Sequence, residues 1–71
     1  MIHVTRLGGS EFVINAELIE TIEQTPDTVI TLTTGHKHVV VEPMDEVVAR
    51  VIAYRRTVFS GLLQQLREDE P

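Results

Sequence analysis

The sequence predicts an α+β fold, a small antiparallel β-sheet of about five strands followed by one long C-terminal α-helix. Residues 1–42 contain short β-branched segments separated by turn residues, whereas residues 43–67 repeat apolar side chains at helical spacing. No linker or internal repeat divides the 71 residues, so we expect one domain, with residues 68–71 as an acidic, solvated tail. The absence of cysteine excludes disulfides and thiolate metal sites.

The N-terminal segment predicts a β-hairpin. Residues 2–7 alternate and are rich in β-branched side chains, and the pair Gly8-Gly9 that follows tolerates positive φ in a turn. Residues 12–14 then form the returning strand. Asn15 is a favourable N-cap, so we expect one helical turn there that places Leu18 against the core.

Two more strands follow the hairpin. The third is expected at residues 20–24, with Ile22 pointing inward between acidic residues. The segment Thr25-Pro26-Asp27-Thr28 predicts the clearest turn, because Pro presets φ and Asp suits the next position. Residues 28–33 form the fourth strand, and Thr34-Gly35 forms the next turn.

The fifth strand, at residues 36–42, contains the run Val39-Val40-Val41, which is apolar on both faces. A strand with two apolar faces has to be covered on both sides. The chain itself supplies one cover, so we expect the second from another copy or a partner. The predicted core of the two central strands is Ile30, Leu32, Val39 and Val41.

The C-terminal helix is predicted to start after Pro43, which suits the first helical position. At 1.5 Å per residue it spans about 36 Å, whereas a six-residue strand spans about 20 Å, so its apolar C-terminal half overshoots the sheet. We prefer a helix that packs against another subunit; the alternative is a break at Gly61 and a fold-back. The expected homo-oligomer interface comprises Val40, Val58, Phe59, Leu62, Leu63 and Leu66.

Charge and composition exclude several function classes. Six basic residues against eleven acidic ones, a net charge of −5, do not suit a phosphate backbone. The N-terminus lacks the pattern of a signal peptide, and no apolar stretch reaches the roughly 18 residues of a membrane span. We find no phosphate loop, acid–base pair or nucleophile context. We therefore expect a cytoplasmic, non-enzymatic protein without a cofactor that binds partners.

Two groups of side chains are candidate sites. His36 and His38 share a face of one predicted strand, and with His3 they could offer nitrogen ligands to a metal ion. A metal site needs three or four ligands and a supporting shell of hydrogen bonds, so we expect exposed or interface histidines instead. Tyr54-Arg55-Arg56 is the candidate partner-binding segment, because Tyr and Arg dominate interface hot spots. Alternatively, Arg55 and Arg56 flank the apolar stripe with their charged heads in water.

A family resemblance rests on several segments in order. They are Ile2-His3-Val4-Thr5-Arg6-Leu7, Thr25-Pro26-Asp27-Thr28-Val29-Ile30-Thr31-Leu32-Thr33, the strand ending at Glu42 and Tyr54-Arg55-Arg56. Over residues 1–56 the chain resembles the bacterial flagellar FlbD family, also called SwrD. Gly8 and His36 depart from the family pattern, and residues 57–71 continue beyond it.

The resemblance implies a cytoplasmic accessory protein of flagellar motility, peripheral at the motor and linked to motor power through a motor or stator protein. It implies no catalytic residue and no cofactor. The arrangement of residues 22–35 also faintly resembles LytTR-type DNA-binding domains, which need basic residues clustered on loops that enter the groove. The acidic turn at residues 25–28 and the single Lys37 in the next loop disfavour this alternative.

Overall fold

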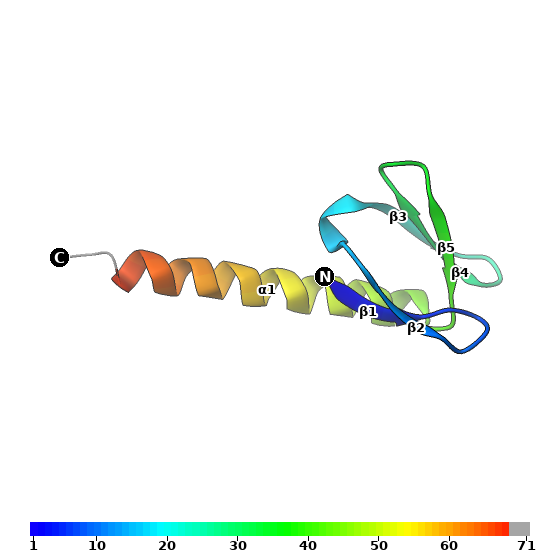
Figure 1. Ribbon diagram of the computed structural model, residues 1–71, viewed down its shortest axis with the longest axis horizontal. Helices are drawn as coiled ribbons and strands as arrows, with labels where there is room; N and C mark the ends of the chain where they lie inside the picture. The colour runs from blue at the N-terminus through cyan, green and yellow to red at the C-terminus, as the bar shows by residue number, and fades with distance from the viewer. Residues whose placement is uncertain (69–71) are drawn as a thin grey trace.

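The computed structural model describes residues 1–68, which form five antiparallel strands and one long helix (Figure 1). This arrangement confirms the predicted α+β fold. Of the predicted acidic tail, Glu68 is the last helical residue, and residues 69–71 lie outside the described part. The elements are β1 (Ile2–Thr5), β2 (Glu11–Ile14), the short 3₁₀ helix η1 (Ala16–Leu18), β3 (Ile19–Gln24), β4 (Thr28–Leu32), β5 (Lys37–Val40) and α1 (Met44–Glu68).

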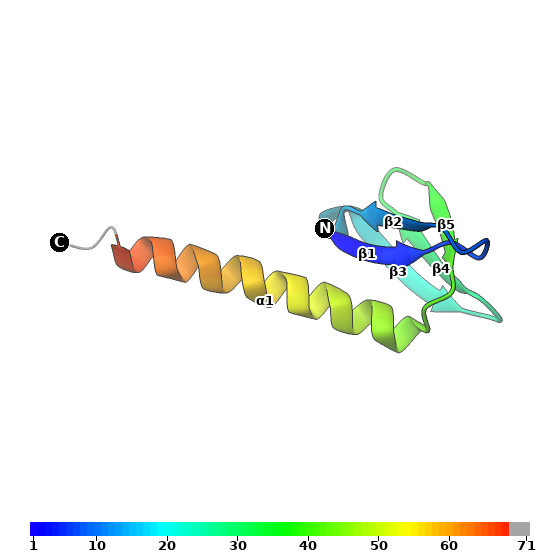
Figure 2. The same ribbon diagram turned by 60° about the horizontal axis from the view of Figure 1, so that its bottom comes forward.

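The strands form two small sheets, a hairpin of β1 and β2 and a three-stranded sheet in the order β3-β4-β5. An isolated bridge between Arg6 and Val40 connects the two sheets. Beside it, the N–H of Val41 donates to the carbonyl of Thr5 at 2.9 Å. The hairpin is therefore tied to the end of β5, the point from which the chain turns into α1 (Figure 2).

Two glycines make the predicted turns possible. Gly9 and Gly35 have φ values of 98° and 92°, in the left-handed region that only glycine enters without strain. The N–H of Gly9 donates to the carbonyl of Arg6, and the N–H of Gly35 donates to the carbonyl of Leu32, each at 2.9 Å. Both turns close where the sequence predicts them.

Asn15 caps η1 as predicted, because its Oδ1 accepts a hydrogen bond of 3.1 Å from the N–H of Glu17. The side chain that this turn buries is Ala16, whereas Leu18 lies exposed. The prediction that Leu18 packs against the core is therefore wrong. The turn is a single tight 3₁₀ turn, so its first residue, not its third, faces the core.

The hydrophobic core lies between the two sheets and the first turns of α1. The register pairs Thr28 with Val40, which places Val40 on the inward face beside Ile30. Val40 is 1% exposed, whereas Val39 and Val41 are 39% and 50% exposed. The predicted inward face of this strand is wrong by one residue, and Val40 is a core residue rather than an interface residue. The core comprises Ile2, Val4, Ile14, Ala16, Ile30, Val40 and Val47.

The helix α1 begins against the sheets and projects beyond them (Figures 1 and 2). Val47 is fully buried, and Val51 and Tyr54 pack against the core from the next turns. The helix continues through Gly61 without a break, so the fold-back alternative is wrong, and the described part measures 53 × 22 × 19 Å. No helix among residues 1–68 is long and apolar enough to cross a membrane.

Candidate partner-binding surface

The projecting part of α1 exposes an apolar surface. Beyond Tyr54 the helix has no sheet to pack against, yet its sequence stays rich in large apolar side chains. The five predicted interface residues on the helix are each between 39% and 60% exposed: Val58, Phe59, Leu62, Leu63 and Leu66. Contiguous exposed apolar surface of this kind is typical of an interaction site. The predicted overshoot is confirmed, whereas the oligomer that it serves stays a prediction.

The candidate segment Tyr54-Arg55-Arg56 divides between two faces of α1. Tyr54 is half-buried and packs against the core, so its ring serves the fold. Arg55 and Arg56 are exposed, and neither forms an ion pair within residues 1–68. The two arginines are thus the part of the segment that a partner can reach, and they can contact a carboxylate-rich surface.

An open depression of about 440 Å³ lies where the middle of α1 passes the start of β1. Tyr54 forms part of its wall, and its lining is mostly apolar. The volume is within the range of small-molecule sites, but the depression is open to solvent rather than enclosed, and such sites usually bury most of their ligand. It is lined by Met1, Ile2, His3, Arg50, Ala53, Tyr54 and Thr57.

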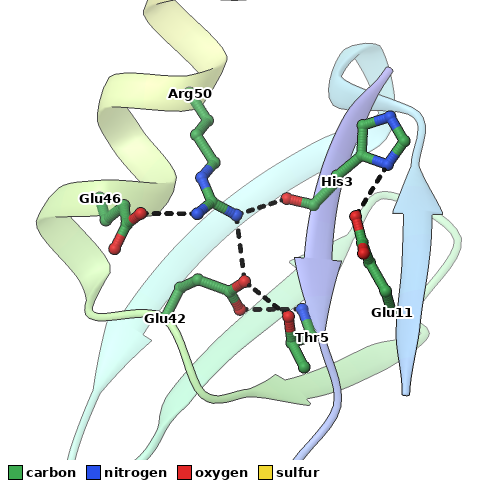
Figure 3. A network of polar contacts seen from close by, with 6 residues as sticks. All are labelled: His3, Thr5, Glu11, Glu42, Glu46 and Arg50. Atoms are coloured by element: carbon green, nitrogen blue, oxygen red, sulfur yellow. Dashed lines mark hydrogen bonds and ion pairs between the residues drawn. The ribbon is translucent and has the colours of Figure 1, made fainter. Parts of the chain in front are cut away.

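A polar network fastens α1 to the hairpin (Figure 3). The carboxylate of Glu42 accepts hydrogen bonds of 2.9 Å from both the N–H and the hydroxyl of Thr5. Arg50 donates to the same carboxylate at 3.0 Å, to the carbonyl of His3 at 2.7 Å and to Glu46 at 2.6 Å. These bonds join β1, the loop before α1 and the second turn of α1, so they fix the direction in which the helix leaves the sheets.

The network also sets the ionisation of its members. Burial is the largest influence on Glu42 and acts to raise its pKa, but the hydrogen bonds from the N–H and hydroxyl of Thr5, from the N–H of Glu42 itself and from Arg50 together outweigh it, so the pKa is lowered. The hydrogen bond to Glu46 is the main cause that raises the pKa of Arg50. Both groups are therefore charged at neutral pH, and the network is a structural clamp.

The histidines are dispersed across the strands and turns. His3 lies 3.2 Å from Glu11 across the hairpin, and His36 shares a hydrogen bond of 2.9 Å with Thr34 in the turn before β5. The ring of His38 packs on that of Phe12 with their centroids 5.4 Å apart. Within residues 1–68 no three His or carboxylate side chains gather to hold a metal ion. Each histidine therefore has a local contact of its own, with Glu11, Thr34 or Phe12.

The basic residues are also dispersed, which bears on the DNA-binding alternative. Arg50 is held in the clamp, and the guanidinium of Arg6 lies 4.0 Å from the centre of the Phe12 ring. Lys37 begins β5, far along the chain from Arg55 and Arg56 on the middle of α1. A DNA reader needs such charges on one face or one pair of loops. The arrangement therefore gives this alternative no support.

Sequence reasoning missed the clamp. The i,i+4 spacing of Glu46 and Arg50 is a readable signal for a helical ion pair. Glu42 gives no such signal, because its partners Thr5 and Arg50 lie 37 and 8 residues away and meet it only in the folded chain. A glutamate just before a predicted helix reads as surface, and only its 8% exposure reveals a packed role.

The comparisons with known proteins give one match. No curated protein and no solved structure matches the chain significantly. The family model described as "FlbD: Flagellar and Swarming motility proteins" matches residues 1–59, which include both sheets, the clamp and α1 as far as Phe59. Since this match covers most of the 71 residues, the chain belongs to the FlbD family of flagellar and swarming motility proteins.

Proposed function

We propose that this chain is a non-enzymatic accessory protein of bacterial flagellar motility, which acts through protein–protein contacts that support the power of the motor or its stator. The membership of the FlbD family supports the link to motility. The observation that carries the mode of action is the apolar and basic surface of the projecting helix, which the fold itself leaves unused. We place its action in the cytoplasm, at the periphery of the motor.

The side chains that come together most closely support a binding role over a catalytic one. Glu42 and Arg50, the acid and base that share the most contacts, are saturated by hydrogen bonds within the clamp. A catalytic acid or base needs a pKa near the working pH and an open position toward a substrate. Glu42 has instead a lowered pKa and is almost fully buried, so it stabilises the fold.

Arg56 is the residue that we propose for contact with an acidic patch on a motor protein. It is exposed on α1, lies within the part of the chain that the family model matches, and contacts no other residue through an ion pair within residues 1–68. Arginine makes bidentate bonds to carboxylates, which suits a contact that must hold under load. Arg55 lies beside it but on the apolar side of the helix.

The test is complementation of a deletion strain with the wild-type chain, with Arg56→Glu or with Lys37→Glu. Lys37→Glu is the matched control, because it reverses one exposed charge on the sheet, away from α1. We expect Arg56→Glu to lower swimming speed and the stall torque of tethered cells at normal protein level, with Lys37→Glu close to wild type. Normal torque with Arg56→Glu would remove this assignment. Normal swimming of the deletion strain itself would contradict the motility function.

A further inference from the structure

A second apolar face runs along α1 beside the one that packs on the sheets. The sheet-facing residues are Val47, Val51 and Tyr54. The second face, which we call the seam, has alternating spacings of four and three residues, the heptad spacing of paired helices. Its apolar members are 40% to 60% exposed along the whole helix. The seam comprises Val48, Ile52, Arg55, Phe59, Leu62 and Leu66.

The spacing of the seam is the same when read from either end, four-three-four-three-four. An identical helix laid antiparallel about a two-fold axis therefore matches every position. Val48 lies opposite Leu66 of the second copy, and Ile52 lies opposite Leu62. Arg55 lies opposite Phe59. A two-fold interface has to be self-complementary in this way, because the same patch serves both subunits.

Arg55 decides the direction of pairing. In a parallel pair it would meet Arg55 of the second copy in the middle of an apolar interface, and two charges there would repel without a counter-ion. In the antiparallel pair its guanidinium meets the ring of Phe59, a favourable cation–π contact. The same chain already uses that contact, because the guanidinium of Arg6 lies 4.0 Å from the centre of the Phe12 ring.

The charges at the two ends of α1 favour the same direction. Asp45 lies in the first turn and Arg67 in the last, and neither forms an ion pair within residues 1–68. In the antiparallel register Asp45 lies opposite residue 69 of the second copy, two positions from its Arg67, whereas a parallel pair places Asp45 against Asp45 and Arg67 against Arg67. The antiparallel pair has one unfavourable contact, because the Arg56 side chains of the two copies come near each other at the two-fold axis. Both are exposed, so they can turn away into solvent.

We infer that the seam of α1 binds the seam of a second copy of this chain, antiparallel, to form a two-fold homodimer. The inference rests on the proposed function only in that it names one partner of the same surface. Because the dimer is measured on the purified chain, the dimer can be disproved without disproving the motility function, and the reverse also holds. The contact is one helix face from each copy, at the lower end of the sizes of stable interfaces. We expect a dissociation constant in the micromolar range.

Cross-linking tests the direction and the register together. The chain has no cysteine, so Ile52→Cys and Leu62→Cys can be made as single variants, one of them tagged. Each variant is oxidised alone, and a mixture of the two is oxidised in parallel. The antiparallel dimer gives a tagged–untagged disulfide dimer only in the mixture. A mixture of Ile52→Cys and Gln64→Cys measures collisional background, because Gln64 lies on the opposite side of the helix. Dimers of each single variant with itself would show parallel pairing, and background yield in the mixture would overturn the inference.

Sedimentation equilibrium on the full chain tests the strength of the contact. The wild type should approach twice its 8.0 kDa at tens of micromolar and above. Leu62→Glu should raise the dissociation constant at least tenfold and Gln64→Glu should not, although both add one negative charge to the same turn. Arg55→Ala should weaken the dimer several-fold, whereas Arg56→Ala should leave it equal or tighter. A monomer at several hundred micromolar, or equal effects within either pair of variants, would overturn the inference. A torque defect of Arg56→Glu with an intact dimer would then report a separate motor contact.

Discussion

Removal of the Glu42 carboxylate is the sharpest test of how the helix is attached. Glu42→Ala deletes the acceptor of three hydrogen bonds, two from Thr5 and one from Arg50. Bonds to a charged group contribute about 1.5–3 kcal/mol each when buried, and because all three bonds are only partly buried we expect about 1 kcal/mol from each. The expected loss is therefore about 3 kcal/mol, a large part of the roughly 5 kcal/mol available to a small domain.

The assay is urea unfolding followed by circular dichroism, with Glu46→Ala as the matched control. Glu46 also binds Arg50, but it is half exposed and forms only an i,i+4 pair, so its loss should cost about 0.5 kcal/mol. If Glu42→Ala leaves too little folded protein, Glu42→Gln keeps the shape of the side chain and removes only its charge. Equal losses from Glu42→Ala and Glu46→Ala would refute the idea that the clamp holds the helix.

The same carboxylate predicts a pH dependence. Its pKa in the folded chain is lowered from the ordinary value of 4.5. A group whose folded pKa is lowered stabilises the fold above its unfolded pKa, and that stabilisation disappears as the pH falls through the folded value. The free energy of unfolding should therefore decrease as the pH drops below about 4.5, more steeply in the wild type than in Glu42→Gln. Parallel pH profiles for the two proteins would contradict this assignment.

Two other substitutions test the packing. Val40→Ala should lower the free energy of unfolding by about 2 kcal/mol, since it removes two buried methyl groups and leaves a cavity. Val39→Ala on the exposed face should change it by less than about 0.5 kcal/mol. Urea unfolding with the opposite ranking would mean that the inward face is misassigned. Gly61→Ala should stabilise the chain by up to about 1 kcal/mol, because a Cβ at this position meets nothing within 4 Å, and reduced helical ellipticity in this variant would show that the helix bends there.

The elements of the fold were predictable because local signals mark them. The glycines at 9 and 35, the cap at Asn15 and the helical spacing after Pro43 each specify one element from neighbouring residues alone. The inward face of β5 was not predictable, because three consecutive valines fit either face equally well. The choice is made by the register with β4, which places Val40 opposite the buried Thr28, and the Arg6–Val40 bridge adds a contact between residues 34 positions apart in the sequence.

The candidate partner-binding surface was also predictable only in part. The overshoot of α1 followed from lengths, since a helix of 25 residues outruns strands of four to six. The burial of Tyr54 did not follow, because an aromatic residue in the middle of an apolar helix fits both a core and a hot spot. The clamp at Glu42 was invisible for a similar reason: its partners come from β1 and α1, and their approach depends on how the hairpin docks.

The clamp and the unbroken helix together hold the C-terminal end of α1 at a fixed distance from the sheets. Residues 58–68 extend about 16 Å past the packed turns at 1.5 Å per residue, and the fixed exit angle keeps that offset constant. A protein bound at the far end of α1 is thus held at a set distance and orientation from whatever the sheets bind. Two such chains joined through their helices would present identical heads at opposite ends of one rod. They would bridge repeated sites with the gain in affinity that bivalent attachment provides.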